Sequence, residues 1–158
     1  MTTPKITLVS NMSASLSFDL RPANDTARPI ELVHNHGWES LAMEALRDAP
    51  LWYLSTPYEF DRVGLYRARV QVALAALDAL HEAGVFVVSP LVMAHAMVET
   101  GNTWLADRWV LDPALLSVAT GVIVLDMPGS EACPVFQSER KLAKRDSVPV
   151  WTMEAVNA

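Results

Sequence analysis

The 158-residue sequence contains a single cysteine, Cys133, so an internal disulfide is excluded. One lone cysteine fits a reducing compartment. No apolar run approaches the roughly 18 residues that a membrane-spanning helix needs, and the first residues lack a charged segment followed by an apolar core. From these absences we expect a cytoplasmic protein that has no membrane partner.

Positive charge is also in the minority. The 12 Lys and Arg residues are outnumbered by 18 Asp and Glu residues, for a net charge of -6, which argues against a nucleic-acid polymer as a partner. A small phosphate group can still be bound locally. Neither a GxGxxG motif nor a Walker loop is present, so the usual modes of binding a dinucleotide or a triphosphate are not supported.

Metal ligands are equally sparse. His34 and His36 have the spacing of a metal-binding pair on a strand, but no third ligand is evident, so we interpret them as two histidines of a loop. We expect neither a metal nor an organic cofactor.

The chain is long enough for one domain with a proper core, since 51% of its residues are hydrophobic. Residues 1–48 form an extension with possible strands at residues 5–9 and 30–33 and a helix over residues 38–47. We interpret this extension as an oligomer contact or a lid. Residues 49–158 form an α/β domain in which strands alternate with helices.

This alternation predicts the fold class. Strands are expected at residues 51–54, 85–88, 122–125 and 149–152, with helices over residues 61–83 and 103–119 and a last helix that contains Glu139. The pattern is typical of a doubly wound parallel sheet, a flavodoxin-like or Rossmann-like three-layer sandwich with strand order 2-1-3-4. Any additional strand would come from the extension.

Ligands of such sheets bind at the carboxyl ends of the strands. The loops that follow the first three expected strands meet at that edge, and the second of these loops is expected to contain His95. Tyr53, Ser55, His95 and Glu139 can therefore converge although they are distant in the sequence.

Two carboxylates are predicted to point inward. Glu139 lies in the middle of the apolar side of its helix, where an unpaired carboxylate costs several kcal/mol, and the nearby helix start favours its ionised form. A solvated Glu in a Ser-Glu-Arg-Lys run is the alternative. Asp112 also falls on an apolar face, but Asp followed by Pro113 is equally a good N-cap that would split the helix.

The motifs resemble those of the nucleoside 2-deoxyribosyltransferase-like family, in a branch of small, largely uncharacterised phage and bacterial proteins. The resemblance covers about residues 51–152. The residues that carry it are the series Tyr53-Leu54-Ser55-Thr56-Pro57-Tyr58, Arg67, Ser89-Pro90-Leu91 with His95, Trp109 with Asp112, and Pro128-Gly129 with Glu139.

The resemblance implies cleavage of the N-glycosidic bond of a nucleoside or nucleotide, by hydrolysis or by transfer of the sugar to a second base. It implies that Glu139 is the nucleophile, that Asp112 helps protonate the departing base and that Tyr53 positions the nucleophile. A glycosyl-enzyme ester would form and then be released with net retention. A homo-oligomer, a dimer or larger, is implied as well.

Further ligand contacts are expected around these residues. The candidates are Ser55, Thr56, Ser130, Arg67 (or Arg62), His95 and Cys133. A solvated position is the alternative for Arg67, and a structural role is the alternative for His95. Cys133 is either a thiol with a lowered pKa at a helix start or, as we favour, a packing residue.

Four positions depart from the family pattern. Cys133 stands where members that act on nucleosides carry Asp and members that act on monophosphates carry Ser, and Val135 replaces a Gly beside the sugar. Pro134 stiffens the loop, and Ser130 replaces a Trp. These departures motivate an alternative, a catalytically silent nucleotide-binding module of the same fold; a third possibility is an oligomeric scaffold. We favour glycosidic cleavage, with a slight preference for hydrolysis of a 5′-monophosphate.

Overall fold

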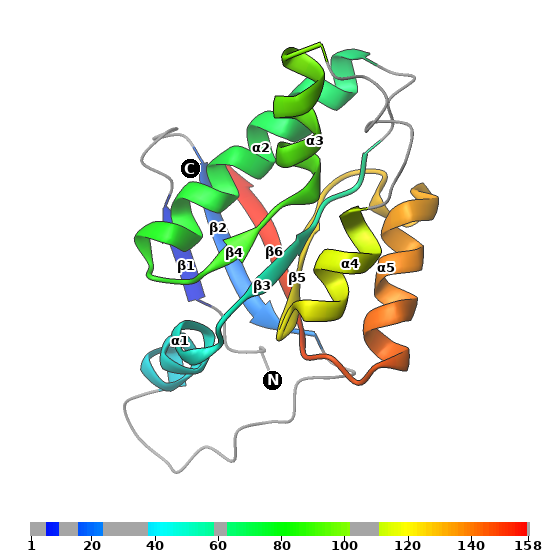
Figure 1. Ribbon diagram of the computed structural model, residues 1–158. Helices are drawn as coiled ribbons and strands as arrows, with labels where there is room; N and C mark the ends of the chain where they lie inside the picture. The colour runs from blue at the N-terminus through cyan, green and yellow to red at the C-terminus, as the bar shows by residue number, and fades with distance from the viewer. Residues whose placement is uncertain (1–5, 10–15, 24–37, 59–62, 102–110, 158) are drawn as a thin grey trace.

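A computed structural model describes residues 6–9, 16–23, 38–58, 63–101 and 111–157 (Figure 1). Within these ranges the chain forms a six-stranded sheet with the order β1-β2-β6-β5-β3-β4. The strands are β1 (Ile6–Val9), β2 (Leu16–Pro22), β3 (Trp52–Ser55), β4 (Val87–Val88), β5 (Gly121–Asp126) and β6 (Val150–Asn157). The helices are α1 (Trp38–Asp48), α2 (Val63–Glu82), α3 (Pro90–Glu99), α4 (Leu111–Val118) and α5 (Pro134–Arg145), with a short 3-10 helix η2 (Ser130–Ala132).

The four strands of the α/β region are parallel. β3 pairs with β4 on one side and with β5 on the other, and β5 pairs with β6. In chain order these four strands are arranged 2-1-3-4, so the predicted order is confirmed. Their sequences explain this placement, because the nearly continuous apolar runs of β3 and β5 suit strands that are covered on both faces.

The other two strands come from the extension and are antiparallel. β2 pairs along its whole length with β6, and β1 pairs with β2. The sheet is therefore mixed and curled, and the prediction of a doubly wound parallel sandwich is wrong; the fold is a general mixed α/β fold. In β2, Phe18 and Leu20 alternate with polar residues, which is the pattern of a half-buried antiparallel strand. No strand is predicted from the sequence at these residues.

The helices agree with the sequence in part. The helices predicted over residues 38–47 and 61–83 are confirmed as α1 and α2. The prediction that His95 lies on a loop is wrong, because Ser89 caps a helix there: its Oγ accepts a 3.4 Å hydrogen bond from the Val92 N–H, and Pro90 occupies the first turn. α4 begins at Leu111. The strand expected at residues 30–33 lies outside the described residues, as do residues 102–110.

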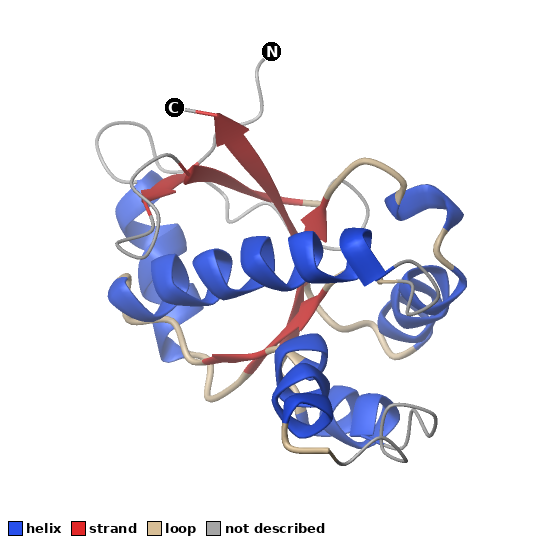
Figure 2. Cartoon of the chain, turned by 90° about the horizontal axis from the view of Figure 1, so that it is seen from above, coloured by secondary structure: helices blue, strands red, loops and turns tan. Residues whose placement is uncertain are grey.

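Alternate residues of the strands face two separate hydrophobic clusters. One cluster joins Leu54 and Ile123 to Val70 of α2, and the other joins Tyr53 and Val122 to the α5 side. Helices consequently lie on both sides of the curled sheet (Figure 2). Among the described helices, none combines the length and the apolar character needed to cross a membrane.

Candidate functional site

The buried carboxylate of Glu139 lies at the centre of the candidate site. α5 begins at Pro134, directly after Cys133, and Glu139 lies in its second turn. Only 4% of Glu139 is exposed, in agreement with the inward orientation that the helical periodicity predicts. Phe136 and Ala143 flank it on the same buried side of the helix. α5 therefore directs a carboxylate into the sheet.

Two hydroxyl groups from β3 hold this carboxylate. The Tyr53 hydroxyl donates a 2.5 Å hydrogen bond to Glu139 Oε1, and the Ser55 hydroxyl donates to Glu139 Oε2. Tyr53 and Ser55 are two residues apart on a strand, so they point to the same face of the sheet. Donors on both oxygens stabilise the ionised form and fix the orientation of the carboxylate.

A buried guanidinium lies at the same edge of the sheet. Arg69 of α2 is 5% exposed, and its Nη2 donates a 3.2 Å hydrogen bond to the Pro128 carbonyl in the loop after β5. Within the described residues its Nη1 has no hydrogen-bond partner. Gly129 has a φ of 88°, and a Cβ at this position would lie 3.1 Å from Arg69 Nη2. A glycine suits this position, because its positive φ strains other residues and a Cβ would crowd the guanidinium.

From the sequence, Arg67 of α2 is named as a candidate contact and Arg69 is not. Arg67 is exposed, whereas Arg69 is buried. The signal was available, because Arg69 lies three residues after Tyr66 and four before Ala73, both members of the apolar stripe of this helix. A cation on an apolar stripe indicates a buried charge.

Thr56 supplies a second polar atom without a partner. It follows Ser55 directly and is 3% exposed, and its Oγ1 makes no hydrogen bond to the described part of the chain. Most buried hydroxyls are hydrogen-bonded, so an unpartnered one suggests a ligand or an ordered water. Thr56 directly follows the end of β3, and Arg69 belongs to α2, which reaches the carboxyl edge of the parallel strands. The two polar atoms without a partner, Thr56 Oγ1 and Arg69 Nη1, thus belong to segments at this edge.

The remaining candidate contacts have structural partners. The Ser130 hydroxyl accepts from the Met127 N–H (2.9 Å) and donates to the Met127 carbonyl (2.6 Å), which closes the loop after β5. Cys133 is fully buried, and its Sγ donates to the Tyr58 carbonyl at 3.5 Å. These contacts pack the loops after β3 and β5 against each other.

His95 and Asp112 are placed on helices α3 and α4. His95 Nδ1 lies 3.2 Å from the Tyr66 hydroxyl, with the two rings edge to face. Burial, and secondarily the negative charge of Glu99, raises the pKa of Tyr66 above its ordinary value. Asp112 is the second residue of α4, and its side chain lies outside the described features.

No group of three or more His, Cys, Asp or Glu side chains with the arrangement of a metal site occurs in the described ranges. His34 and His36 fall outside those ranges. The polar centre consequently consists of one carboxylate, hydroxyl groups and one guanidinium.

The fold and this cluster define a mixed α/β protein with a buried polar centre at the carboxyl edge of its parallel strands. Residues 51–155 match the family model described as "Domain of unknown function (DUF1937)", and the chain belongs to that family. β1, β2 and α1 precede the matched residues. Comparisons with curated proteins and with solved structures gave no match.

Proposed function

We propose that the protein cleaves the N-glycosidic bond of a nucleoside 5′-monophosphate, with Glu139 as the nucleophile. The observation that carries this proposal is the burial of Glu139 together with its two hydroxyl donors, Tyr53 and Ser55. A carboxylate in such a site is oriented before the substrate arrives, which is how enzymes prepare a nucleophile. The motif resemblance assigns the same residue to the same role.

The chemistry follows from the two carboxylate oxygens. Each oxygen has more than one acceptor position, so Glu139 can keep a hydroxyl donor while one lone pair attacks the anomeric carbon. The bond from carbon to the base nitrogen breaks, its electron pair goes to the base, and Asp112 is proposed to supply the proton. Attack by water on the glycosyl ester then releases the sugar, whereas attack by a second base gives transfer.

The phosphate preference of the proposal rests on Arg69 and Thr56. A buried guanidinium with one free nitrogen is energetically unfavourable unless an anion approaches it. Phosphate oxygens accept hydrogen bonds from both guanidinium and hydroxyl groups. These two residues therefore support a phosphate-bearing substrate over a plain nucleoside.

A catalytically silent nucleotide-binding module is the second candidate. Both oxygens of Glu139 already accept hydroxyl hydrogen bonds, and Val135 and Cys133 replace family residues near the sugar. In this alternative Glu139 is a structural carboxylate that joins α5 to β3. The homo-oligomer and the cytoplasmic location remain predictions of the sequence; light scattering would test the first.

The decisive experiment measures free base released from a panel of nucleosides and 5′-monophosphates by chromatography. Wild type is expected to release base from at least one monophosphate, and Glu139→Gln is expected to lower the rate about a thousandfold or more, as loss of a nucleophile does. Glu44→Gln is the matched control, because Glu44 is exposed on α1. Adding a second base then separates transfer from hydrolysis.

Absence of base release from the whole panel by a folded wild-type protein would favour the silent module. Equal rates for wild type and Glu139→Gln would remove Glu139 from the reaction. Both outcomes can be read only alongside circular dichroism spectra that show the native fold in each variant.

A further inference from the structure

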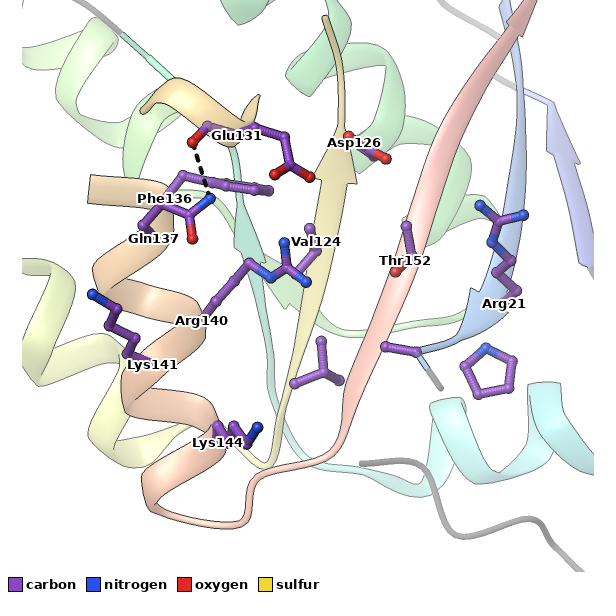
Figure 3. A pocket seen from close by; sticks show the side chains of 13 residues that line it. Arg21, Val124, Asp126, Glu131, Phe136, Gln137, Arg140, Lys141, Lys144 and Thr152 are labelled. Carbon is purple, nitrogen blue, oxygen red and sulfur yellow. Dashed lines mark hydrogen bonds between the residues drawn. The ribbon is translucent and has the colours of Figure 1, made fainter. Parts of the chain in front are cut away.

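α5 covers only part of its side of the sheet. Glu139 is directed toward β3, whereas the opposite flank of α5 borders a cavity of about 740 Å³ that extends over β5 and β6 to the end of β2 (Figure 3). Glu139, Tyr53 and Ser55 do not line this cavity. The cavity is therefore distinct from the buried carboxylate centre, and its volume is within the range of small-molecule sites.

Positive charge gathers along one wall of this groove. Arg140, Lys141 and Lys144 of α5 line the groove, with the Arg140 side chain directed toward β5, and Arg21 of β2 stands on the opposite wall (Figure 3). Four of the 12 cationic residues of a chain with net charge -6 thus line one groove. Arg21 forms an ion pair with Glu154, so the positive charge of the groove comes from the three α5 residues. A positive site on an otherwise acidic protein attracts anions selectively.

The three α5 cations differ from their neighbour Arg145. Arg145 is held by Asp146 through hydrogen bonds of 2.6 and 2.9 Å. In contrast, Arg140, Lys141 and Lys144 form no ion pair with a carboxylate of the described chain. Their charges are available to a ligand.

Arg140 is also preorganised by an aromatic ring. Its Cζ lies 5.9 Å from the centroid of the Phe136 ring, a cation–π arrangement that orients the guanidinium without neutralising it. Arg140 and Lys144 are one helical turn apart, so their charged groups can bind neighbouring anionic groups of one ligand.

The other end of the groove has the opposite charge. Asp126, at the end of β5, and Glu131, in η2, lie beyond Arg140, away from Lys144 (Figure 3). Carboxylates repel phosphates and accept hydrogen bonds from hydroxyl or amino groups. Thr152 adds a hydroxyl on the β6 side of the cavity. The groove therefore distinguishes the two ends of an asymmetric ligand.

From this arrangement we propose that the groove is a binding site for a phosphorylated small molecule of the nucleoside diphosphate class. The phosphates lie along Arg140, Lys141 and Lys144, and the hydroxyl or amino groups face Asp126 and Glu131. Because β2 precedes the residues that match the family model, the extension supplies one wall of the site. The site is separate from the glycosidic chemistry proposed for Glu139.

The test is titration calorimetry of the full chain with ADP, pyrophosphate and adenosine at low ionic strength. ADP is expected to bind, pyrophosphate to bind more weakly and adenosine not to bind. Arg140→Gln and Lys144→Gln are each expected to weaken ADP binding about five- to tenfold, since each removes a charged contact at a partly exposed site. Glutamine keeps the helix propensity at these exposed positions.

Arg145→Gln is the matched control, because it removes the same charge from the same helix outside the groove. This variant is expected to change ADP affinity less than twofold. An equal loss of affinity in all three variants would overturn the proposal, because it would show that ADP responds only to the overall positive charge of α5. Adenosine binding as tightly as ADP would also overturn it. Glu139→Gln is expected to bind ADP with the affinity of wild type. Loss of ADP binding in this variant would place the ligand at the buried carboxylate instead. This result does not depend on whether the protein releases base from nucleotides.

Discussion

Tyr53 and Glu139 are joined by a 2.5 Å hydrogen bond although they are 86 residues apart in the chain. The bond links β3, which lies between β4 and β5 in the sheet, to α5. Tyr53 belongs to the buried cluster on the α5 side of the sheet, so breaking the bond removes a hydrogen bond from two buried polar groups. A structural and a catalytic role for Glu139 both begin from this contact.

Tyr53→Phe is expected to lower the free energy of unfolding by about 1–3 kcal/mol, because it removes a donor from a buried carboxylate. In the Glu139→Gln background the same change should be less destabilising, since a neutral amide needs that donor less. Urea unfolding of the two single variants and the double variant gives the coupling energy. Additive effects would show that the hydroxyl and the carboxylate do not stabilise each other.

Arg69→Met is expected to change the free energy of unfolding by less than about 1 kcal/mol in the absence of phosphate, because it removes a buried charge with an unpartnered nitrogen together with one hydrogen bond. Inorganic phosphate should raise the Tm of wild type more than that of Arg69→Met, because both proteins keep the groove beside α5 and only wild type keeps the Arg69 contact. Arg67→Met, an exposed control two residues away, should respond like wild type, and chloride at equal ionic strength corrects for salt. An unchanged phosphate response in Arg69→Met would contradict an anion contact at Arg69.

Gly129→Ala is expected to destabilise the protein more than Gly101→Ala, by about 1 kcal/mol. Both glycines have a positive φ, 88° and 83°, so both alanines carry the same backbone strain. Only at Gly129 does the new Cβ also meet the Arg69 guanidinium, whereas the space around Gly101 is open. Thermal unfolding of the two variants compares them directly, and equal losses would mean that the guanidinium moves away at no cost.

Tyr66 gives the protein a predictable response to alkaline pH. Its pKa in the folded state is raised above 10.0, first by burial and then by Glu99, while the unfolded chain titrates near 10.0. Stability from this group is complete below pH 10 and declines as the pH rises, because the unfolded state then loses the Tyr66 proton first. Urea unfolding at pH 9 and pH 11 should show wild type losing stability relative to Tyr66→Phe. A constant difference between the two proteins would assign the alkaline response to other groups.

Local pattern was sufficient to predict the parallel strands and the inward side of α5. Two local features carried these predictions: the apolar runs of β3 and β5, and the position of Glu139 on the helical wheel. Both are properties of short stretches of sequence, and the folded structure keeps them. The same patterns placed the loops after β3 and β5 at one edge of the sheet.

The parts that could not be predicted depend on distant partners. The alternation in β2 is local and short, but its place in the sheet depends on pairing with β6, whose sequence lies more than a hundred residues later. The helical periodicity places Arg69 on the apolar stripe of α2, but its partner, the Pro128 carbonyl, is 59 residues away and could not be predicted from that stripe. The groove beside α5 arises because β2 widens the sheet beyond this helix. It therefore results from the pairing of β2 with β6 and not from a sequence motif.

The pairing of β2 with β6 also determines an order of events during synthesis. Residues 16–22 leave the ribosome early. However, β2 pairs with β6 through residues 151–157, which are synthesised last. β1 in turn pairs with β2. β1 and β2 can pair with each other early, but the other edge of β2 stays unpaired until nearly all of the chain has emerged, and contacts of such long sequence separation form slowly. A nascent chain halted before residue 150 would expose this edge of β2 to other chains, so the pairing of β6 is the step that protects it from aggregation.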